Sequence, residues 1–96
     1  MTVGFHPDAY AEFRAAALYY ESRVVGLGGE FISEVEQIVA LLEEFPTLGV
    51  RMDAVHRRLP LRRFPFALIY RSDLPGTCVV AVAHDRRRPG YWQSRD

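Results

Sequence analysis

The chain contains no lysine, a single cysteine and no long apolar run, and two of these absences limit what it can be. Cys78 alone cannot form a disulfide within the chain, and its apolar strand pattern predicts a buried, unreactive thiol. The apolar stretches are far shorter than the roughly 20 residues that span a bilayer. Residues 1–5 lack the basic and apolar segments of a secretory signal, so we expect a cytoplasmic protein.

What the chain does contain is enough for one globular domain. Its 96 residues are 49% hydrophobic and 25% charged, as in an ordinary folded protein with one core. It has no internal repeat, low-complexity tract or linker, so we expect a single domain over residues 1–96. All 12 basic residues are arginines. Arginine suits bidentate contacts with phosphate or carboxylate, but a GC-rich genome also favours it, so the positions of the arginines are more informative.

The net charge of zero conceals an opposed distribution. Residues 1–50 contain two arginines and eight acidic residues, a net charge of −6, whereas residues 51–96 contain ten arginines and four acidic residues, a net charge of +6. A basic half of this density could meet nucleic acid or an acidic protein partner. Alternatively, the two halves face and neutralise each other within the fold.

The periodicity predicts a short strand followed by two helices. The strand, residues 2–5, stops at His6 and Pro7, and proline followed by Asp8 and Glu12 is typical of a helix start. A second helical period follows the glycines of residues 26–29 and closes at Pro46, so the short loop predicts an antiparallel helical hairpin. The expected apolar faces are Tyr10, Phe13, Ala17, Tyr20 and Val24, then Leu27, Phe31, Val35, Ile38 and Leu42. The expected exposed side of the second helix carries Glu30, Glu34, Glu36, Gln37, Glu43 and Glu44.

After Gly49 the period changes to two, which indicates strands. Residues 55–60 alternate, residues 64–70 are rich in aromatic and β-branched types, and residues 72–76 have turn chemistry. Residues 77–83 are apolar almost throughout, which favours a central strand. The predicted fold class is α+β: an N-terminal strand, an antiparallel helical hairpin, and an antiparallel sheet of about three further strands, ending in a C-terminal tail of arginines and aromatics.

The tail is the most informative segment. It reads His84-Asp85-Arg86-Arg87-Arg88-Pro89-Gly90-Tyr91-Trp92. Arginines and large aromatics dominate binding hot spots, so this composition predicts a recognition surface. The predicted target-binding residues are Arg86, Arg87, Arg88, Tyr91 and Trp92. An alternative for Trp92 is that its ring folds back and caps the core.

Six local strings occur in an order and spacing that cover nearly the whole chain. They are Tyr19-Tyr20-Glu21, Gly26-Leu27-Gly28 with Phe31, Phe45-Pro46, Val55-His56-Arg57-Arg58, Arg63-Phe64-Pro65-Phe66 with Ile69-Tyr70, and Ala83-His84-Asp85-Arg86-Arg87 with Pro89-Gly90-Tyr91-Trp92. Together they resemble the RelE/ParE superfamily of bacterial toxins from type II toxin-antitoxin systems. The resemblance is strongest to the ParE-like branch, often described as plasmid stabilization proteins.

The resemblance implies a toxin but leaves its target open, because the superfamily shares a fold and not an activity. ParE-like members inhibit DNA gyrase and block replication, whereas RelE-like members cut mRNA in the ribosomal A site. Both are neutralised in a hetero-oligomer by a cognate antitoxin, expected to be acidic and to carry a DNA-binding domain. Neither activity needs a metal or an organic cofactor.

RNA cleavage would require a proton acceptor as well as cations. In the RelE-like nucleases a C-terminal tyrosine lies six residues past a basic residue, but six residues past Arg86 stands Trp92, which has no ionisable group. If the chain is a nuclease, the catalytic candidates are His84, Arg86 and Tyr91, although a histidine at a strand end is more often structural. We therefore favour gyrase inhibition, with the nuclease or an inactive antitoxin-binding homologue as alternatives.

Four further arginines are candidates for phosphate contact or antitoxin binding. They are Arg57, Arg58, Arg62 and Arg63. They could act together with the tail if the strands bring them to one face, but strand alternation sends Arg57 and Arg58 to opposite faces. The three histidines are too scattered for metal-ligand spacing, so no metal site is expected.

Overall fold

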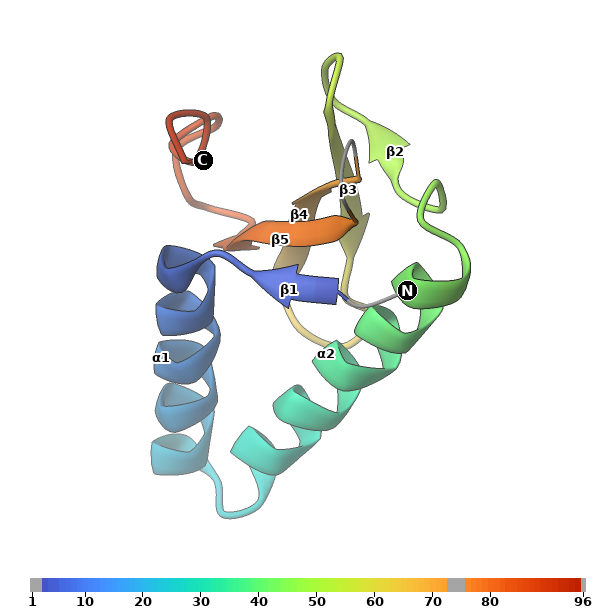
Figure 1. Ribbon diagram of the computed structural model, residues 1–96. Helices are drawn as coiled ribbons and strands as arrows, with labels where there is room; N and C mark the ends of the chain where they lie inside the picture. The colour runs from blue at the N-terminus through green and yellow to red at the C-terminus, as the bar shows by residue number, and fades with distance from the viewer. Residues whose placement is uncertain (1–2, 73–75, 96) are drawn as a thin grey trace.

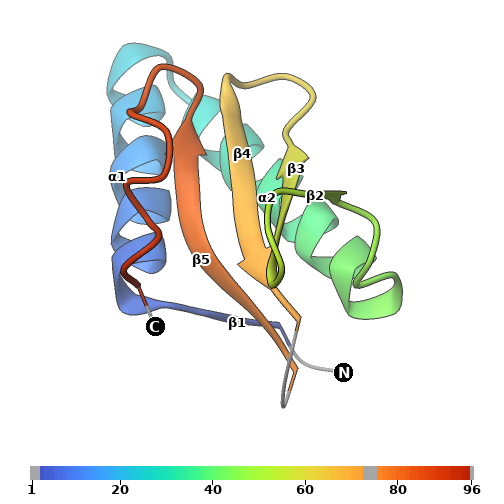
Figure 2. The same ribbon diagram turned by 90° about the horizontal axis from the view of Figure 1, so that it is seen from above.

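One mixed sheet, covered on one face by a helical hairpin, makes up the molecule (Figures 1 and 2). The computed structural model describes residues 3–72 and 76–95. In chain order the elements are β1 (Val3–Phe5), α1 (Pro7–Arg23), α2 (Leu27–Glu44), β2 (Val50–Arg51), β3 (His56–Pro60), β4 (Phe66–Arg71) and β5 (Thr77–His84). The predicted α+β class is confirmed. Within the described ranges, neither helix combines the length and apolarity needed to cross a membrane.

The strand order β1-β5-β4-β3-β2 places β5 inside the sheet, as its apolar sequence predicted. The predicted antiparallel pairing of the strands after the hairpin is confirmed for β2 to β5. The pairing of the N-terminal strand was not predicted, and β1 pairs with β5 in parallel, with Val3 opposite Thr77. β2 was not predicted, because two residues are too few to show a period. The predicted turn at residues 72–76 falls partly on residues 73–75, which lie outside the described residues.

Helix α1 begins where the sequence predicts, and its predicted apolar face is confirmed in part, since Ala17 is buried and Phe13 and Tyr20 pack, partly buried, against the core. The His6 side chain accepts a hydrogen bond from the Asp8 backbone N–H at 3.0 Å, and Pro7 opens the helix. The fully buried residues are alanines, at positions 9, 16 and 17, whereas Tyr10 and Val24 are more than half exposed. Small side chains let α1 approach its neighbours closely, so Tyr10 and Val24, at the two ends of the expected stripe, lie at the margin of the contact.

Helix α2 supplies the larger part of the core. Its predicted apolar face is confirmed, with Phe31, Val35, Ile38 and Leu42 buried. The Phe31 ring lies between 5.2 and 5.4 Å from the rings of Tyr20, Phe64 and Phe66, measured between centroids. These aromatic contacts join both helices to the β3–β4 loop and to β4, so the hairpin is fixed on the sheet.

Gly28 marks the closest approach of the two helices, and we expect it to tolerate no side chain. A Cβ atom built there would lie 2.5 Å from the Ala17 carbonyl oxygen, whereas one at Gly29 would have no neighbour within 4 Å. Gly28→Ala is expected to lower the free energy of unfolding by about 1–3 kcal/mol through overpacking. Gly29→Ala, the matched control, should raise it by up to about 1 kcal/mol through helix propensity. Urea denaturation measures both, and equal effects would contradict the contact.

Candidate functional site: a C-terminal arginine tail

The face of the sheet opposite the helices carries a second, smaller apolar cluster that the C-terminal tail covers. Ile69, Val80 and Ala81 form its base and Trp92 its cover. A β-bulge explains why two consecutive residues of β5 reach the same cluster: Ile69 pairs with Ala81 and Tyr70 with Val79, which leaves Val80 without a partner in the ladder. The tail runs back over this face from the end of β5 (Figures 1 and 2).

Trp92 is a packing residue. Its side chain is only 4% exposed, and its ring centroid lies 4.7 Å from that of His56. The ring is folded back on the core, as the alternative interpretation predicted, and a contact of Trp92 with a target stays a prediction. The physical reason is that the tail must cover an apolar patch that the helices on the other face cannot reach.

His56 is held in place beneath Trp92 by Asp53. Its Nδ1 lies 3.0 Å from both carboxylate oxygens of Asp53. The same carboxylate accepts the backbone N–H groups of Val55 and His56, and these bonds hold the pKa of Asp53 below its usual value. His56 therefore acts as a fixed surface for the tryptophan ring, in keeping with a structural histidine.

Arg95 anchors the end of the tail to α1. Its guanidinium donates to both carboxylate oxygens of Glu12 at 2.9 Å and to the Val80 carbonyl oxygen at 3.0 Å. Glu12 also accepts the backbone N–H of Val82 at 3.0 Å. Burial raises the pKa of Glu12, but the bonds from Arg95 and Val82 outweigh it and hold that pKa below its usual value. Neither residue was predicted here, because a pair so distant in sequence leaves no spacing signal.

Tyr91 lies between two arginines of the tail. The guanidinium carbons of Arg87 and Arg95 are 4.0 and 5.0 Å from the centre of its ring, which are cation–π distances. Burial and the nearby Glu12 carboxylate raise the pKa of Tyr91 to about 12. The phenol therefore keeps its proton at neutral pH and is a poor proton acceptor.

The three consecutive arginines do not play one role. Arg87 turns toward the body, where its guanidinium lies 3.8 Å from Glu12 as well as over Tyr91. Arg86 and Arg88 are exposed and make no side-chain bond with any other described residue. His84, at the end of β5, accepts the Arg86 backbone N–H at Nδ1, so this histidine closes the turn that leads into the arginines.

The other arginine candidates are dispersed. Arg57 donates to the carbonyl oxygens of Thr47 and Gly49, next to α2, whereas Arg58 reaches the tail, 3.4 Å from Asp85. The predicted separation of these two neighbours onto opposite faces is confirmed. Arg58 alone of the four lines the pocket of about 170 Å³ between the tail and the sheet.

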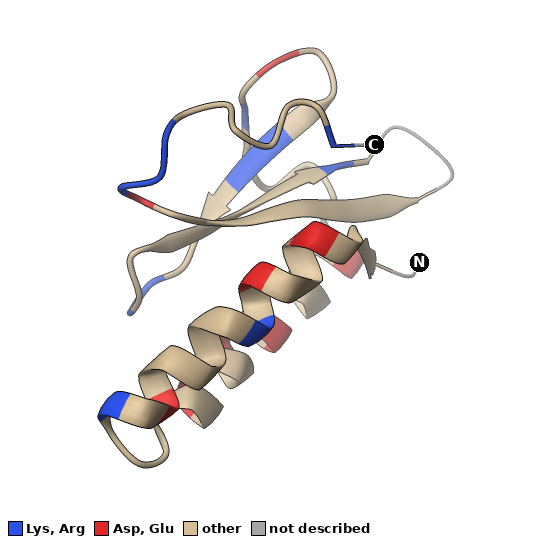
Figure 3. Ribbon diagram, turned by 90° about the vertical axis from the view of Figure 1, so that its left-hand side faces the viewer, with Lys and Arg blue, Asp and Glu red and all other residues tan. Residues whose placement is uncertain are grey.

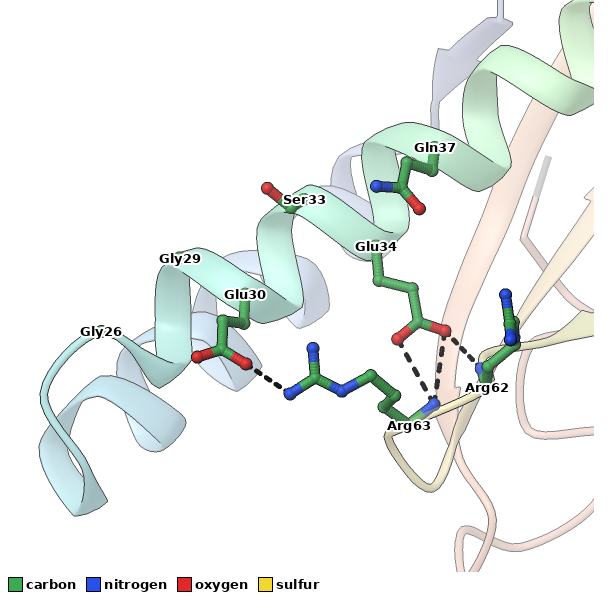
Figure 4. A pocket seen from close by; sticks show the side chains of 8 residues that line it. All are labelled: Gly26, Gly29, Glu30, Ser33, Glu34, Gln37, Arg62 and Arg63. Atoms are coloured by element: carbon green, nitrogen blue, oxygen red, sulfur yellow. Dashed lines mark hydrogen bonds and ion pairs between the residues drawn. The ribbon is translucent and has the colours of Figure 1, made fainter.

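Arg62 and Arg63 line a different pocket, of about 430 Å³, between α2 and the β3–β4 loop (Figure 4). Glu34 accepts the backbone N–H groups of both, and Glu30 pairs with the Arg63 guanidinium. Glu34 is 8% exposed, so the prediction that it lies on the solvent side of its helix is wrong. Its carboxylate satisfies a loop backbone that has no strand partner there.

The charges are divided between the layers of the fold. In Figure 3 the acidic residues lie mainly on the helices and the arginines mainly on the sheet and tail. Ion pairs cross between the layers, from Glu12 to Arg95 and Arg87 and from Glu30 to Arg63. The two halves thus neutralise each other in part, and Arg86 and Arg88 remain outside these pairs.

Comparison with known proteins assigns this arrangement to a family. The family model described as "ParE toxin of type II toxin-antitoxin system, parDE" matches residues 3–89. The chain belongs to the ParE toxin family. It is a ParE-like toxin of a type II toxin-antitoxin system, as the six strings predicted, and the family implies an antitoxin partner. Tyr91, Trp92 and Arg95 lie beyond the matched residues.

A solved structure agrees with this ParE-like fold. The structure described as "Chromosomal ParDE TA system from P. aeruginosa" superposes with a TM-score of 0.63, covering 88% of this chain and 95% of that chain. The sequence identity is 18%, so the likeness concerns the fold. A search of curated proteins found no significant match.

Proposed function

We propose that this ParE-like toxin inhibits DNA gyrase by binding, with Arg86 and Arg88 as direct contacts to the target. The observation that carries the proposal is the pair of exposed arginines, without side-chain bonds to the rest of the described chain, on a loop that buried residues anchor. A guanidinium that is not already paired can form a charge-assisted bond with a carboxylate or phosphate of a partner. A toxin with this target acts in the cytoplasm.

The candidate proton acceptors support binding over RNA cleavage. The raised pKa of Tyr91 keeps its hydroxyl protonated, and His84 Nδ1 is engaged with the Arg86 backbone. The arginines can stabilise negative charge on a phosphate, but RNA cleavage also requires a group that removes the 2′-OH proton. Binding requires neither group to change its protonation state.

Pulse labelling after induced expression in a susceptible bacterium tests the target. Thymidine and methionine incorporation are followed in one culture, and we expect DNA synthesis to stop first. Arg86→Ala/Arg88→Ala provides the inactive control. Prior arrest of methionine incorporation would overturn the proposal in favour of the ribosome-dependent nuclease, and growth without arrest would favour an inactive antitoxin-binding homologue.

We also propose a docking surface for the antitoxin around the edge strand β2 and the C-terminal end of α2. Six apolar residues there are between 37 and 73% exposed: Leu41, Phe45, Leu48, Val50, Met52 and Val55. Val50 belongs to β2, the edge strand, so an extended antitoxin segment can pair with its free edge. Arg51 and Arg57 lie on β2 and β3, and favour an acidic segment.

Leu48→Glu/Val50→Glu is expected to weaken antitoxin binding by at least about 100-fold, because it places charge on the centre of an apolar contact. The cognate antitoxin is the probe, and titration calorimetry gives the affinity. Val25→Glu is the control, since Val25 is 93% exposed at the tip of the helical hairpin, away from this surface. Equal binding by both variants would place the antitoxin elsewhere.

A further inference from the structure

The arginine loop, residues 86–90, is attached to the body of the protein mainly through side chains. The backbone bonds of the described tail after residue 85 are local. The N–H groups of Arg87, Tyr91, Gln93 and Arg95 donate to the carbonyls of His84, Arg88, Gly90 and Trp92, respectively. No strand of the described chain pairs with it. The orientation of the loop therefore depends on the few side chains that reach the sheet and α1.

Besides the buried Trp92 ring, the tail is attached by the ion pair of Arg95 with Glu12. Both side chains are largely buried, 13 and 16% exposed, and the contact is bidentate. The pair also occupies the edge of β5 that β1 leaves uncovered, because β1 pairs only with residues 77–79. There Arg95 bonds the Val80 carbonyl and Glu12 bonds the Val82 N–H, so one ion pair joins α1, β5 and the tail.

The same ion pair contacts the inner arginine of the loop and the Tyr91 ring. Glu12 attracts Arg87, and Tyr91 is sandwiched between Arg87 and Arg95. Arg87 is thereby drawn back against the body. Its neighbours Arg86 and Arg88 form no such contact within residues 3–72 and 76–95 and are exposed, which separates one anchoring arginine from two that can bind.

We propose that the Glu12–Arg95 ion pair is a positioning device, which fixes the arginine loop in the orientation in which Arg86 and Arg88 bind the target. Glu12 and Arg95 touch no target themselves and act through the loop. The inference rests on the proposed function, because it explains how Arg86 and Arg88, the proposed target contacts, are held in place. A loop held in one orientation loses less conformational entropy on binding than a free one.

The test uses Glu12→Gln and Arg95→Met in the full chain, with Arg95→Lys as the conservative variant. Glu30→Gln is the matched control, because it removes the same charge from the helical layer and breaks the ion pair with Arg63 in the other pocket. Three quantities are measured: the affinity for purified gyrase, growth arrest after induction, and the rate of tryptic cleavage after Arg86 and Arg87 in the folded protein. The thermal midpoint of each variant is measured as well, so that a change in its cleavage rate or affinity can be compared with its loss of stability.

We expect trypsin to cleave the arginine loop of Glu12→Gln and Arg95→Met at least about tenfold faster than that of the parent chain. We also expect both variants to bind gyrase at least about tenfold more weakly. Arg95→Lys should recover part of both, and Glu30→Gln should match the parent chain. If the Glu12–Arg95 pair only stabilised the fold, its loss would change the cleavage rate and the gyrase affinity only by raising the fraction of unfolded protein. Trypsin would then cleave at sites throughout the chain and not mainly in the arginine loop.

Two results would overturn the inference: unchanged protection of the loop, or lost protection with full growth arrest. Failure of the proposed function has a different signature, in which the parent chain binds no gyrase. In that case the growth arrest and loop protection of the same variants still decide whether the pair positions the loop.

Discussion

Trp92→Ala is expected to lower the free energy of unfolding by about 3–5 kcal/mol, the usual cost of removing a buried aromatic side chain. The ring covers the apolar cluster on the face of the sheet opposite the helices, and its removal exposes Ile69, Val80 and Ala81. It also removes the surface that packs on His56. Because whole domains are stable by only about 5–15 kcal/mol, the variant should be partly unfolded at growth temperature.

Trp92→Phe separates packing from recognition. Phenylalanine keeps much of the buried ring area, so we expect a loss well below that of alanine together with retained growth arrest. Urea denaturation gives the free energies, and induced expression gives the toxicity. A Trp92→Ala protein with parental stability but no toxicity would show that the indole contacts the target after all, and would require the tail to open on binding.

Arg86→Ala/Arg88→Ala is expected to show the opposite pattern, with the fold intact and target binding lost. Both side chains are exposed and unpaired within the described chain, so their removal should change the free energy of unfolding by no more than about 0.5 kcal/mol. Arginine contacts at hot spots are worth at least about 2 kcal/mol, so binding to gyrase should weaken by more than about 100-fold in the double variant.

Arg14→Ala is the control for this loss of charge. Arg14 is an exposed arginine of α1 that also makes no side-chain bond with another described residue. Surface plasmon resonance with immobilised gyrase measures the affinity, and thermal denaturation confirms folding. Parental affinity in the double variant would place the target contact outside the arginine loop, whereas an equal loss in Arg14→Ala would indicate a general effect of net charge.

Together, the two expected results divide the tail into parts with different roles. Trp92 and Arg95 fix the tail to the sheet and to α1, Arg87 and Tyr91 connect that anchor to the loop, and the outer arginines face solvent. Composition alone predicts that all of these residues form one recognition surface, since arginines and aromatics are enriched at binding sites and in anchored tails alike. Their burial in the structure distinguishes the residues that anchor the tail from those available to bind a target.

Local patterns in the sequence determined most of the secondary structure and the family. The helix start at Pro7, the apolar face of α2 and the central position of β5 each follow from residues close together in the chain. Such features depend on backbone capping and on the period of apolar side chains, which neighbouring residues express directly. The six strings that indicated a ParE-like toxin are local in the same sense.

Only the tertiary structure decided how the tail is held. Glu12 and Arg95 are 83 residues apart, and nothing in the spacing or composition joins them. Likewise, the burial of Glu34 depends on its bond with the Arg62 backbone, 28 residues later, and the parallel pairing of β1 depends on where the chain returns. A side chain's partner is set by the path of the whole backbone, so the positions of Trp92 and of the free arginines became visible only in the fold.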